Sequence, residues 1–189
     1  LQSLGMEVGE KPSLSQWRDY LARRAAATKS VRIALVGKYE LQDAYKSIRE
    51  SLQHAGVYND RKVEIEFVNS QFLTRENVAQ ALAPMAGVVI CPGFGERGTE
   101  GKILAAEYCR THDVPTLGIC YGMQMIVVEF ARNVLGLADA NSAEIAPDTK
   151  HNVIDLMEGQ KNITRMGGTM RLGAYPCRLK PGSKVAEIY

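Results

Sequence analysis

One cysteine lies in a turn whose residue types and spacing suit nucleophilic chemistry. Residues 118–122 read Gly-Ile-Cys-Tyr-Gly, a G-x-C-x-G pattern between an apolar strand and an amphipathic helix. In such an elbow the nucleophile lies at the tip, and side chains at Gly118 or Gly122 would crowd the bend. Cys120 would also lie at the positive end of the following helix, which favours the reactive thiolate. The pattern predicts attack on a carbonyl carbon; the alternative is a buried packing cysteine.

A second glycine-rich segment, Pro92 to Gly98, contains a formal G-x-G-x-x-G between a predicted strand and a predicted helix. It follows the third predicted strand, and no acidic residue ends a strand about 20 residues later, so a dinucleotide site is disfavoured. An oxyanion hole fits better, because the Gly93 N–H could join the Tyr121 N–H in holding a developing negative charge. A glycine-rich turn without a ligand is the alternative.

Three histidines are candidates for the base that the nucleophile needs, and Glu144 is a candidate contact for the substrate. A cysteine nucleophile needs a base, normally a histidine oriented by an acid. His54 ends a predicted helix and is interpreted as a capping or surface residue, and His112 lies at the wrong end of the strand that leads into the elbow. His151, with Asp155 four residues later, could reach the site, although a loop histidine is the favoured interpretation. Glu144 could hold the ammonium group of an amino-acid substrate, or be a solvated loop charge.

Alternating strands and helices must position these residues. Strands are predicted over 31–36, 62–69, 87–91 and 114–119, and helices over 44–55, 74–82, 98–112 and 121–135, with Gly56 stopping the first helix. This order predicts an α/β fold with a mainly parallel, twisted sheet and helices on both faces. The elbow and the glycine loop both fall at the carboxyl ends of strands, where such folds place their chemistry. We interpret residues 1–30 as an interdomain linker or arm, and 31–189 as the domain.

Composition excludes several classes of protein. The 189 residues are 46% hydrophobic with a net charge of +2, and they contain no basic run, which argues against a nucleic-acid partner. No apolar stretch approaches the length of a membrane span, and no signal peptide is recognisable. Four cysteines without disulfide or zinc spacing indicate reduced thiols in a cytoplasmic protein, with Cys91 and Cys109 as packing residues. Because the chain begins with Leu1, we expect it to start inside a longer polypeptide.

Several segments of the sequence resemble those of a known protein family. Gly-Ile-Cys-Tyr-Gly-Met-Gln at 118–124 resembles the nucleophile motif of the class I glutamine amidotransferases. Segments 37–48, 92–103, 129–134 and 167–173 are similar to the glutaminase domain of the CTP synthase family. The resemblance covers nearly the whole chain, including the segment before residue 30, which resembles that family's linker from the synthetase domain.

The resemblance implies a flavodoxin-like fold in which Cys120 attacks the side-chain amide of glutamine and forms a thioester. It implies that the released ammonia passes to a synthetase domain of the same polypeptide, which uses ATP and Mg²⁺ to aminate UTP to CTP. Family members respond to GTP as an activator and form homotetramers; this domain itself would need no cofactor or metal. The family's glutamine contacts fall on Gly93, Tyr121, Gly122, Met123, Gln124 and Glu144, with the backbone amides of Gly93 and Tyr121 at the oxyanion.

The sequence departs from the family pattern in three ways. Pro92 stands where a glycine is usual and has no N–H to donate, and Tyr121 stands where leucine is common. The family's His-Pro-Glu motif, which carries the base, and an Arg-His-Arg-Tyr-Glu stretch would follow Tyr189, so the domain is expected to be incomplete and nearly inactive alone. Three alternatives stay open: a cysteine-elbow hydrolase or chaperone-like protein, a non-catalytic glutamine-binding module, and a nucleotide-binding module.

Overall fold

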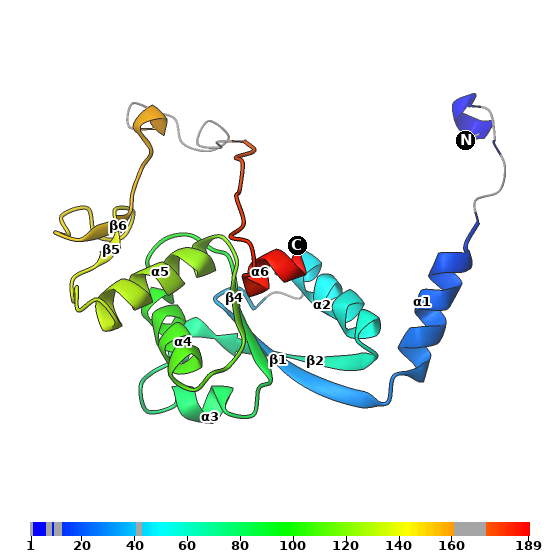
Figure 1. Cartoon of the computed structure of the whole chain (residues 1–189), viewed down its shortest axis with the longest axis horizontal. Coiled ribbons are helices and arrows are strands. Elements are labelled where there is room, and N and C mark those ends of the chain that lie inside the picture. Colours follow the sequence, from blue (N-terminus) through cyan, green and yellow to red (C-terminus); the bar gives the residue numbers. More distant parts are fainter. Residues whose placement is uncertain (1, 7–8, 10–12, 41–42, 161–172) are drawn as a thin grey trace. The chain divides into compact units, whose positions relative to one another are not determined.

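The computed structural model of the chain describes every residue except 1, 7–8, 10–12, 41–42 and 161–172. The chain divides into two compact units, Leu1–Ile154 and Asp155–Tyr189, and each is described by itself. The first unit contains the elbow and the glycine loop (Figure 1). Most of the family-like string at 167–173 lies outside the described residues.

A four-stranded parallel sheet forms the centre of the first unit. Its strands are β1 (Lys29–Gly37), β2 (Arg61–Asn69), β3 (Gly87–Ile90) and β4 (Thr116–Gly118), in the order β2-β1-β3-β4. Every neighbouring pair is parallel. A separate two-stranded parallel pair joins β5 (Asn141–Ser142) to β6 (Asn152–Ile154). The sequence-based prediction of a mainly parallel sheet is confirmed.

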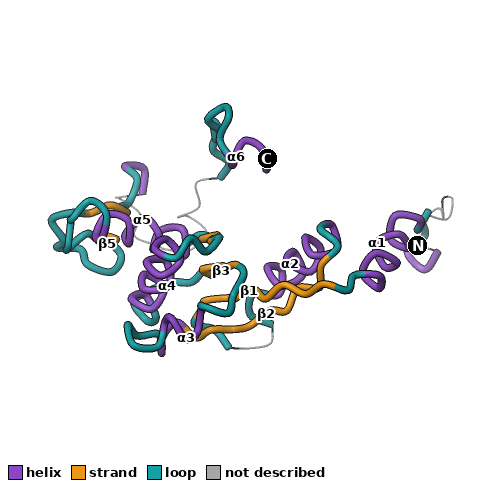
Figure 2. The backbone as a smooth tube through the Cα atoms, turned by 60° about the horizontal axis from the view of Figure 1, so that its bottom comes forward, coloured by secondary structure: helices purple, strands orange, loops and turns teal. Residues whose placement is uncertain are grey.

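Helices pack on both faces of the sheet, as predicted, because successive strand residues point to opposite sides. The helices of this unit are α1 (Ser15–Ala26), α2 (Lys46–Tyr58), α3 (Val78–Leu82), α4 (Thr99–Thr111) and α5 (Tyr121–Asn133), with short 3-10 turns η1 (Gln2–Leu4) and η2 (Ser70–Phe72). Leu35 packs with Leu52 of α2 on one face, whereas Val36 and Ile90 pack with Ala105 of α4 on the other. Figure 2 shows the backbone of the sheet with α2 and α4 beside it.

The segment predicted to be a linker forms the exposed helix α1, which buries none of its residues. Arg23 donates to the carbonyl oxygen of Tyr58 at 2.9 Å and to Asp60 Oδ1 at 3.1 Å, so α1 is tied to the end of α2. The predicted stop of α2 at Gly56 was wrong: the helix continues to Tyr58. Gly56 is instead needed for close packing, because a Cβ there would lie 2.6 Å from Val63 Cγ2. The domain boundary at residues 30/31 stays a prediction.

The second unit contains little regular structure among its described residues. It has a 3-10 turn, η3 (Glu158–Gln160), and a terminal helix, α6 (Lys184–Ile188), which Ser183 caps by accepting from the Ala186 N–H at 3.2 Å. Across the described parts of both units, no helix has the length and apolar character needed to cross a membrane.

Candidate active site

The elbow has the backbone conformation that its sequence predicts. Cys120 lies between β4 and α5 with φ 55° and ψ −112°, a conformation that costs a non-glycine residue about 1–3 kcal/mol. The residue is exposed. Ile119 donates its N–H to the carbonyl oxygen of Ile90 at 3.0 Å, so the turn is fixed to the end of β3. The strained geometry therefore presents the thiol at the carboxyl edge of the sheet.

Close packing explains both flanking glycines. A Cβ on Gly118 would lie 2.6 Å from the backbone nitrogen of Met123, and a Cβ on Gly122 would lie 2.0 Å from the carbonyl oxygen of Ile90. Real Cβ atoms do not approach backbone atoms this closely. The first turn of α5 can therefore pack against β3 only with glycine at these positions, and this packing puts the elbow beside the loop that follows β3.

That loop, residues 92–98, receives contacts from distant parts of the chain. Glu144 Oε1 accepts the N–H of Gly95 at 2.9 Å, so the predicted substrate-binding acid lies against the predicted oxyanion loop. Gly95 and Gly98 have φ of +67° and +76°, which glycine adopts without strain. Within the part of the chain that the structure describes, the N–H groups of Gly93 and Tyr121 have no hydrogen-bond partner.

Two buried lysines lie beneath the glycine loop. Lys102 is 0% exposed, and its ammonium donates to the carbonyl oxygens of Cys91 at 2.6 Å and Pro92 at 3.3 Å. Lys38 is 5% exposed and donates to the carbonyl oxygens of Phe94 and Gly95. Neither lysine forms an ion pair with a carboxylate among the described residues, which is unusual for buried charge.

Burial shifts the titration of both lysines. The pKa of Lys102 is lowered to about 8, chiefly because the ammonium is removed from water; Lys38 acts in the same direction, while Cys91 and Cys120 oppose the shift. Burial also lowers the pKa of Lys38, with Arg97 acting in the same direction and Glu144 against it. Two lysine side chains therefore lie beneath the glycine loop, and backbone carbonyl oxygens accept hydrogen bonds from both.

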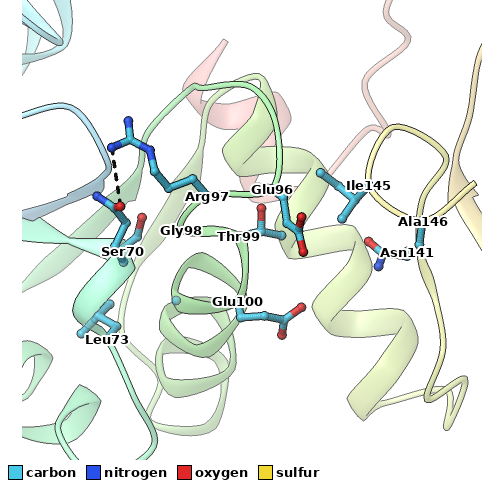
Figure 3. Close-up of a pocket in the computed structure, with 12 residues that line it drawn as sticks. Ser70, Leu73, Glu96, Arg97, Gly98, Thr99, Glu100, Asn141, Ile145 and Ala146 are labelled. Carbon is cyan, nitrogen blue, oxygen red and sulfur yellow. Dashed lines mark hydrogen bonds between the residues drawn. The ribbon is translucent and has the colours of Figure 1, made fainter.

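A pocket of about 530 Å³ lies on the outer side of the same loop. Glu96, Arg97 and Gly98 line it together with Ser70 and Asn141, as Figure 3 shows. The hydroxyl of Ser70 is buried without a hydrogen-bond partner in the described structure. Cys120 is not among the residues that line this pocket.

Comparison with known proteins identifies the fold and the family. The family model for glutamine amidotransferase class-I matches residues 40–188, which is most of the chain. The chain belongs to this family. Among solved structures, the glutaminase domain of Trypanosoma brucei CTPS with bound acivicin is similar, with a TM-score of 0.66 and 36% sequence identity. That match covers 70% of this chain and 52% of the other.

Curated relatives of this amidotransferase chain are named CTP synthase. Those of Bacteroides fragilis, Porphyromonas gingivalis and Listeria innocua are 65%, 55% and 50% identical to this chain. Each alignment has 190 positions and covers 100% of this chain. The chain spans only 35–36% of the length of these relatives. The predicted resemblance is thereby confirmed at the level of the family and of the domain.

The histidines of the amidotransferase chain have partners other than Cys120. His54 lies edge-on to Tyr20 with ring centroids 5.2 Å apart, and His112 bonds the carbonyl oxygen of Tyr108 at the end of α4. His151 pairs with Asp139. The exposure of His54 agrees with its interpretation as a capping or surface residue. The partners found for the described histidines do not include Cys120.

Sequence reasoning missed three residues that shape the amidotransferase site: Lys38, Lys102 and the side chain of Tyr121. The Tyr121 hydroxyl lies 2.6 Å from Thr99 Oγ1 and donates to the carbonyl oxygen of Gly95 at 3.0 Å, whereas only its backbone was expected to matter. Burial raises the pKa of Tyr121, and its ring lies 5.0 Å from Lys102 Nζ. A lysine inside the apolar run 101–106 was the available signal for Lys102.

The buried cysteines of the chain are packing residues, as predicted. Burial raises the pKa of the Cys91 thiol to about 12, and burial likewise raises the pKa of Cys109. Both thiols therefore stay protonated and unreactive near neutral pH. Cys120 and Cys177 are the exposed thiols of the described chain.

Proposed function

We propose that this chain is the glutaminase part of a CTP synthase and supplies ammonia for the ATP-dependent amination of UTP. The supporting observation is the elbow itself: a solvent-accessible cysteine in a left-handed conformation, between two close-packed glycines and beside a loop contacted by Glu144. Membership of the amidotransferase family and similarity to curated CTP synthases agree with this assignment.

The proposed reaction proceeds through a thioester. The Cys120 thiolate attacks the side-chain amide carbon of glutamine, and the carbonyl oxygen becomes an oxyanion that the N–H groups of Gly93 and Tyr121 hold. Protonation of the nitrogen breaks the C–N bond and releases ammonia. Water then attacks the thioester, releasing glutamate and regenerating the thiol.

Substrate recognition is assigned to the surface around the elbow. Glu144 is an exposed carboxylate beside the loop and would hold the α-ammonium group of glutamine through a charge-assisted hydrogen bond. Gly122, Met123 and Gln124 occupy the first turn of α5, and Met123 is 51% exposed there. These residues would contact the remainder of the substrate.

A general base must come from beyond the residues seen near Cys120. Each of the three histidines is engaged elsewhere, and His151 already pairs with Asp139. We therefore infer that residues 1–189 by themselves bind glutamine but turn it over slowly, and that the base is contributed by further sequence.

The proposed enzyme would couple this chemistry to a synthetase domain of the same polypeptide. The described residues contain no cluster of three His, Cys, Asp or Glu side chains that could hold a metal ion. From the resemblance to CTP synthases we assign ATP, Mg²⁺ and UTP to the synthetase domain, GTP to the role of an activator, and the whole enzyme to a cytoplasmic homotetramer.

Labelling with a glutamine-derived electrophile tests the proposal. The diazoketone analogue of glutamine should label Cys120, as peptide mass spectrometry would show, and excess glutamine should protect it. The full-length enzyme should release glutamate, and Cys120→Ala should release none. Labelling by iodoacetamide without glutamine protection would favour a general cysteine hydrolase, and protection by glutamine without turnover in the full-length enzyme would favour a binding module.

A further inference from the structure

The peptide that carries the proposed oxyanion donor is held from its carbonyl side. In a trans peptide the C=O and the following N–H point in opposite directions. The carbonyl oxygen of Pro92 accepts from Lys102 Nζ at 3.3 Å and from the Tyr45 hydroxyl at 3.4 Å. The Gly93 N–H, on the same peptide, therefore points away from these two donors.

A neighbouring peptide shows the same arrangement with both sides occupied. Lys38 donates to the carbonyl oxygen of Phe94, and the N–H on the opposite side, that of Gly95, donates to Glu144 at 2.9 Å. Each peptide thus has a buried ammonium on its carbonyl side. A negative group lies on the N–H side of the second peptide, and by analogy an oxyanion would lie on the N–H side of the first.

We propose that Lys102 is a positioning residue for the glutaminase reaction: it fixes the Pro92–Gly93 peptide so that the Gly93 N–H faces the oxyanion of the tetrahedral intermediate. This inference rests on the proposed function. Lys102 does not touch the substrate; it acts through the carbonyl oxygens of Cys91 and Pro92.

Burial makes Lys102 suited to this role. Its side chain is 0% exposed, and a Cβ on Gly93 would lie 3.3 Å from its ammonium, so the loop is packed directly on it. The ring of Tyr121, whose own N–H is the second proposed donor, faces the same ammonium with a centroid distance of 5.0 Å. Lys38 borders the same two residues, with its Cε 3.1 Å from a Cβ on Gly93 and its ammonium 5.9 Å from the Tyr121 ring centroid. Of the two lysines, Lys102 is the one that donates to the Pro92 carbonyl, which belongs to the peptide that carries the Gly93 N–H.

Two lysine variants of similar burial separate this role from a structural one. In the full-length enzyme, Lys102→Met should lower kcat for glutamate release by about 30- to 100-fold with KM for glutamine within 3-fold, because it misaligns a donor that acts in the transition state. Lys38→Met should instead raise KM, by about 10-fold, because Lys38 orients the peptide that binds Glu144. Tyr45→Phe should lower kcat about 3-fold by removing the weaker donor to Pro92.

The rate of Cys120 alkylation by iodoacetamide distinguishes the two roles. If Lys102 were merely structural, its substitution would slow alkylation as well as glutamate release. The limiting alkylation rate at high pH involves no oxyanion, so Lys102→Met should leave it within about 2-fold of wild type. Equal losses in alkylation and in kcat, or an unchanged kcat, would overturn the positioning role. If Lys102→Met does not fold, an unchanged kcat in Tyr45→Phe would reject it. Absence of glutamate release by the wild-type enzyme would instead reject the proposed function itself.

Discussion

The two strand-to-helix turns of the site end adjacent strands, but different parts of the chain hold them in place. The elbow after β4 is held by backbone contacts: Cys120 has a positive φ, Gly118 packs on Met123 of the same turn, and Gly122 packs on the carbonyl oxygen of Ile90 at the end of β3. The loop after β3 is shaped by side chains from elsewhere, namely Lys38, Tyr121 and Glu144 among others. Backbone packing therefore presents the candidate nucleophile, whereas side chains from distant parts of the chain shape the loop beside it.

The largest expected effect comes from removing the nucleophile. Cys120→Ala should reduce glutamate release by the full-length enzyme by at least about 10³-fold, because no other described thiol occupies an elbow. Cys177→Ala, which removes the other exposed thiol, should leave the rate within 2-fold. Retained activity in Cys120→Ala would remove the elbow from the reaction.

Disrupting the packing of the elbow should cost stability. Gly122→Ala places a methyl group 2.0 Å from the carbonyl oxygen of Ile90 and should lower the free energy of unfolding by about 3 kcal/mol. Gly136→Ala is the control, because that glycine has φ +73° but no neighbour within 4 Å, and should cost about 1 kcal/mol. Equal costs in denaturant titrations would show that the contact with Ile90 does not require glycine at position 122.

Lys102, beneath the glycine loop, should make the free energy of unfolding depend on pH. The pKa of Lys102 is about 8 in the folded state, below its ordinary 10.5, so the unfolded state binds more protons between these pH values. The unfolding free energy of the wild type should consequently rise relative to Lys102→Met by up to roughly 3 kcal/mol from pH 8 to 10.5. Cys91, Cys120 and Lys38 face the same ammonium, so the comparison of the two proteins, not either alone, is the measurement. A pH-independent difference would show that Lys102 titrates normally.

Glu144 connects the loop to the substrate and should have an intermediate effect. Glu144→Gln keeps an oxygen that can accept the Gly95 N–H but loses the charge proposed to hold the α-ammonium group. KM for glutamine should rise by about 10- to 100-fold with a smaller change in kcat. Asp148→Asn removes an exposed charge from the same segment and should change neither value. A KM equal to wild type would show Glu144 to be a structural ligand of the loop only.

The smallest expected effect comes from the Tyr121 side chain, which connects the elbow to the glycine loop through its hydroxyl. Tyr121→Phe removes the hydroxyl that contacts Thr99 and Gly95 and should cost about 1 kcal/mol in unfolding free energy. We expect kcat to fall by only a few-fold, since the backbone donor at this position is retained. Tyr58→Phe, at a residue that is 78% exposed, is the matched control for thermal denaturation.

The fold could be predicted from sequence to a large extent because its strands are short apolar runs separated by amphipathic helices. The end of α2 was predicted wrongly because a single glycine was taken as a helix stop. Gly56 was predicted to stop α2, but tertiary packing against Val63 needs a glycine inside that helix. The partner of His151 is Asp139, which no local pattern in the sequence pointed to.

The sequence by itself predicted the candidate nucleophile, its elbow and the glycine loop, because each depends on residues that are close together along the chain. The alternation of strands and helices along the chain predicted the parallel sheet, although the strands that pair are distant in sequence. Only the tertiary structure decided what lies beneath and beside that loop. Lys38, Lys102 and Glu144 come from three separate elements, and their roles depend on which carbonyl or N–H each one reaches. No local pattern encodes that choice, because it is made when the sheet, α4 and the 141–146 segment pack together.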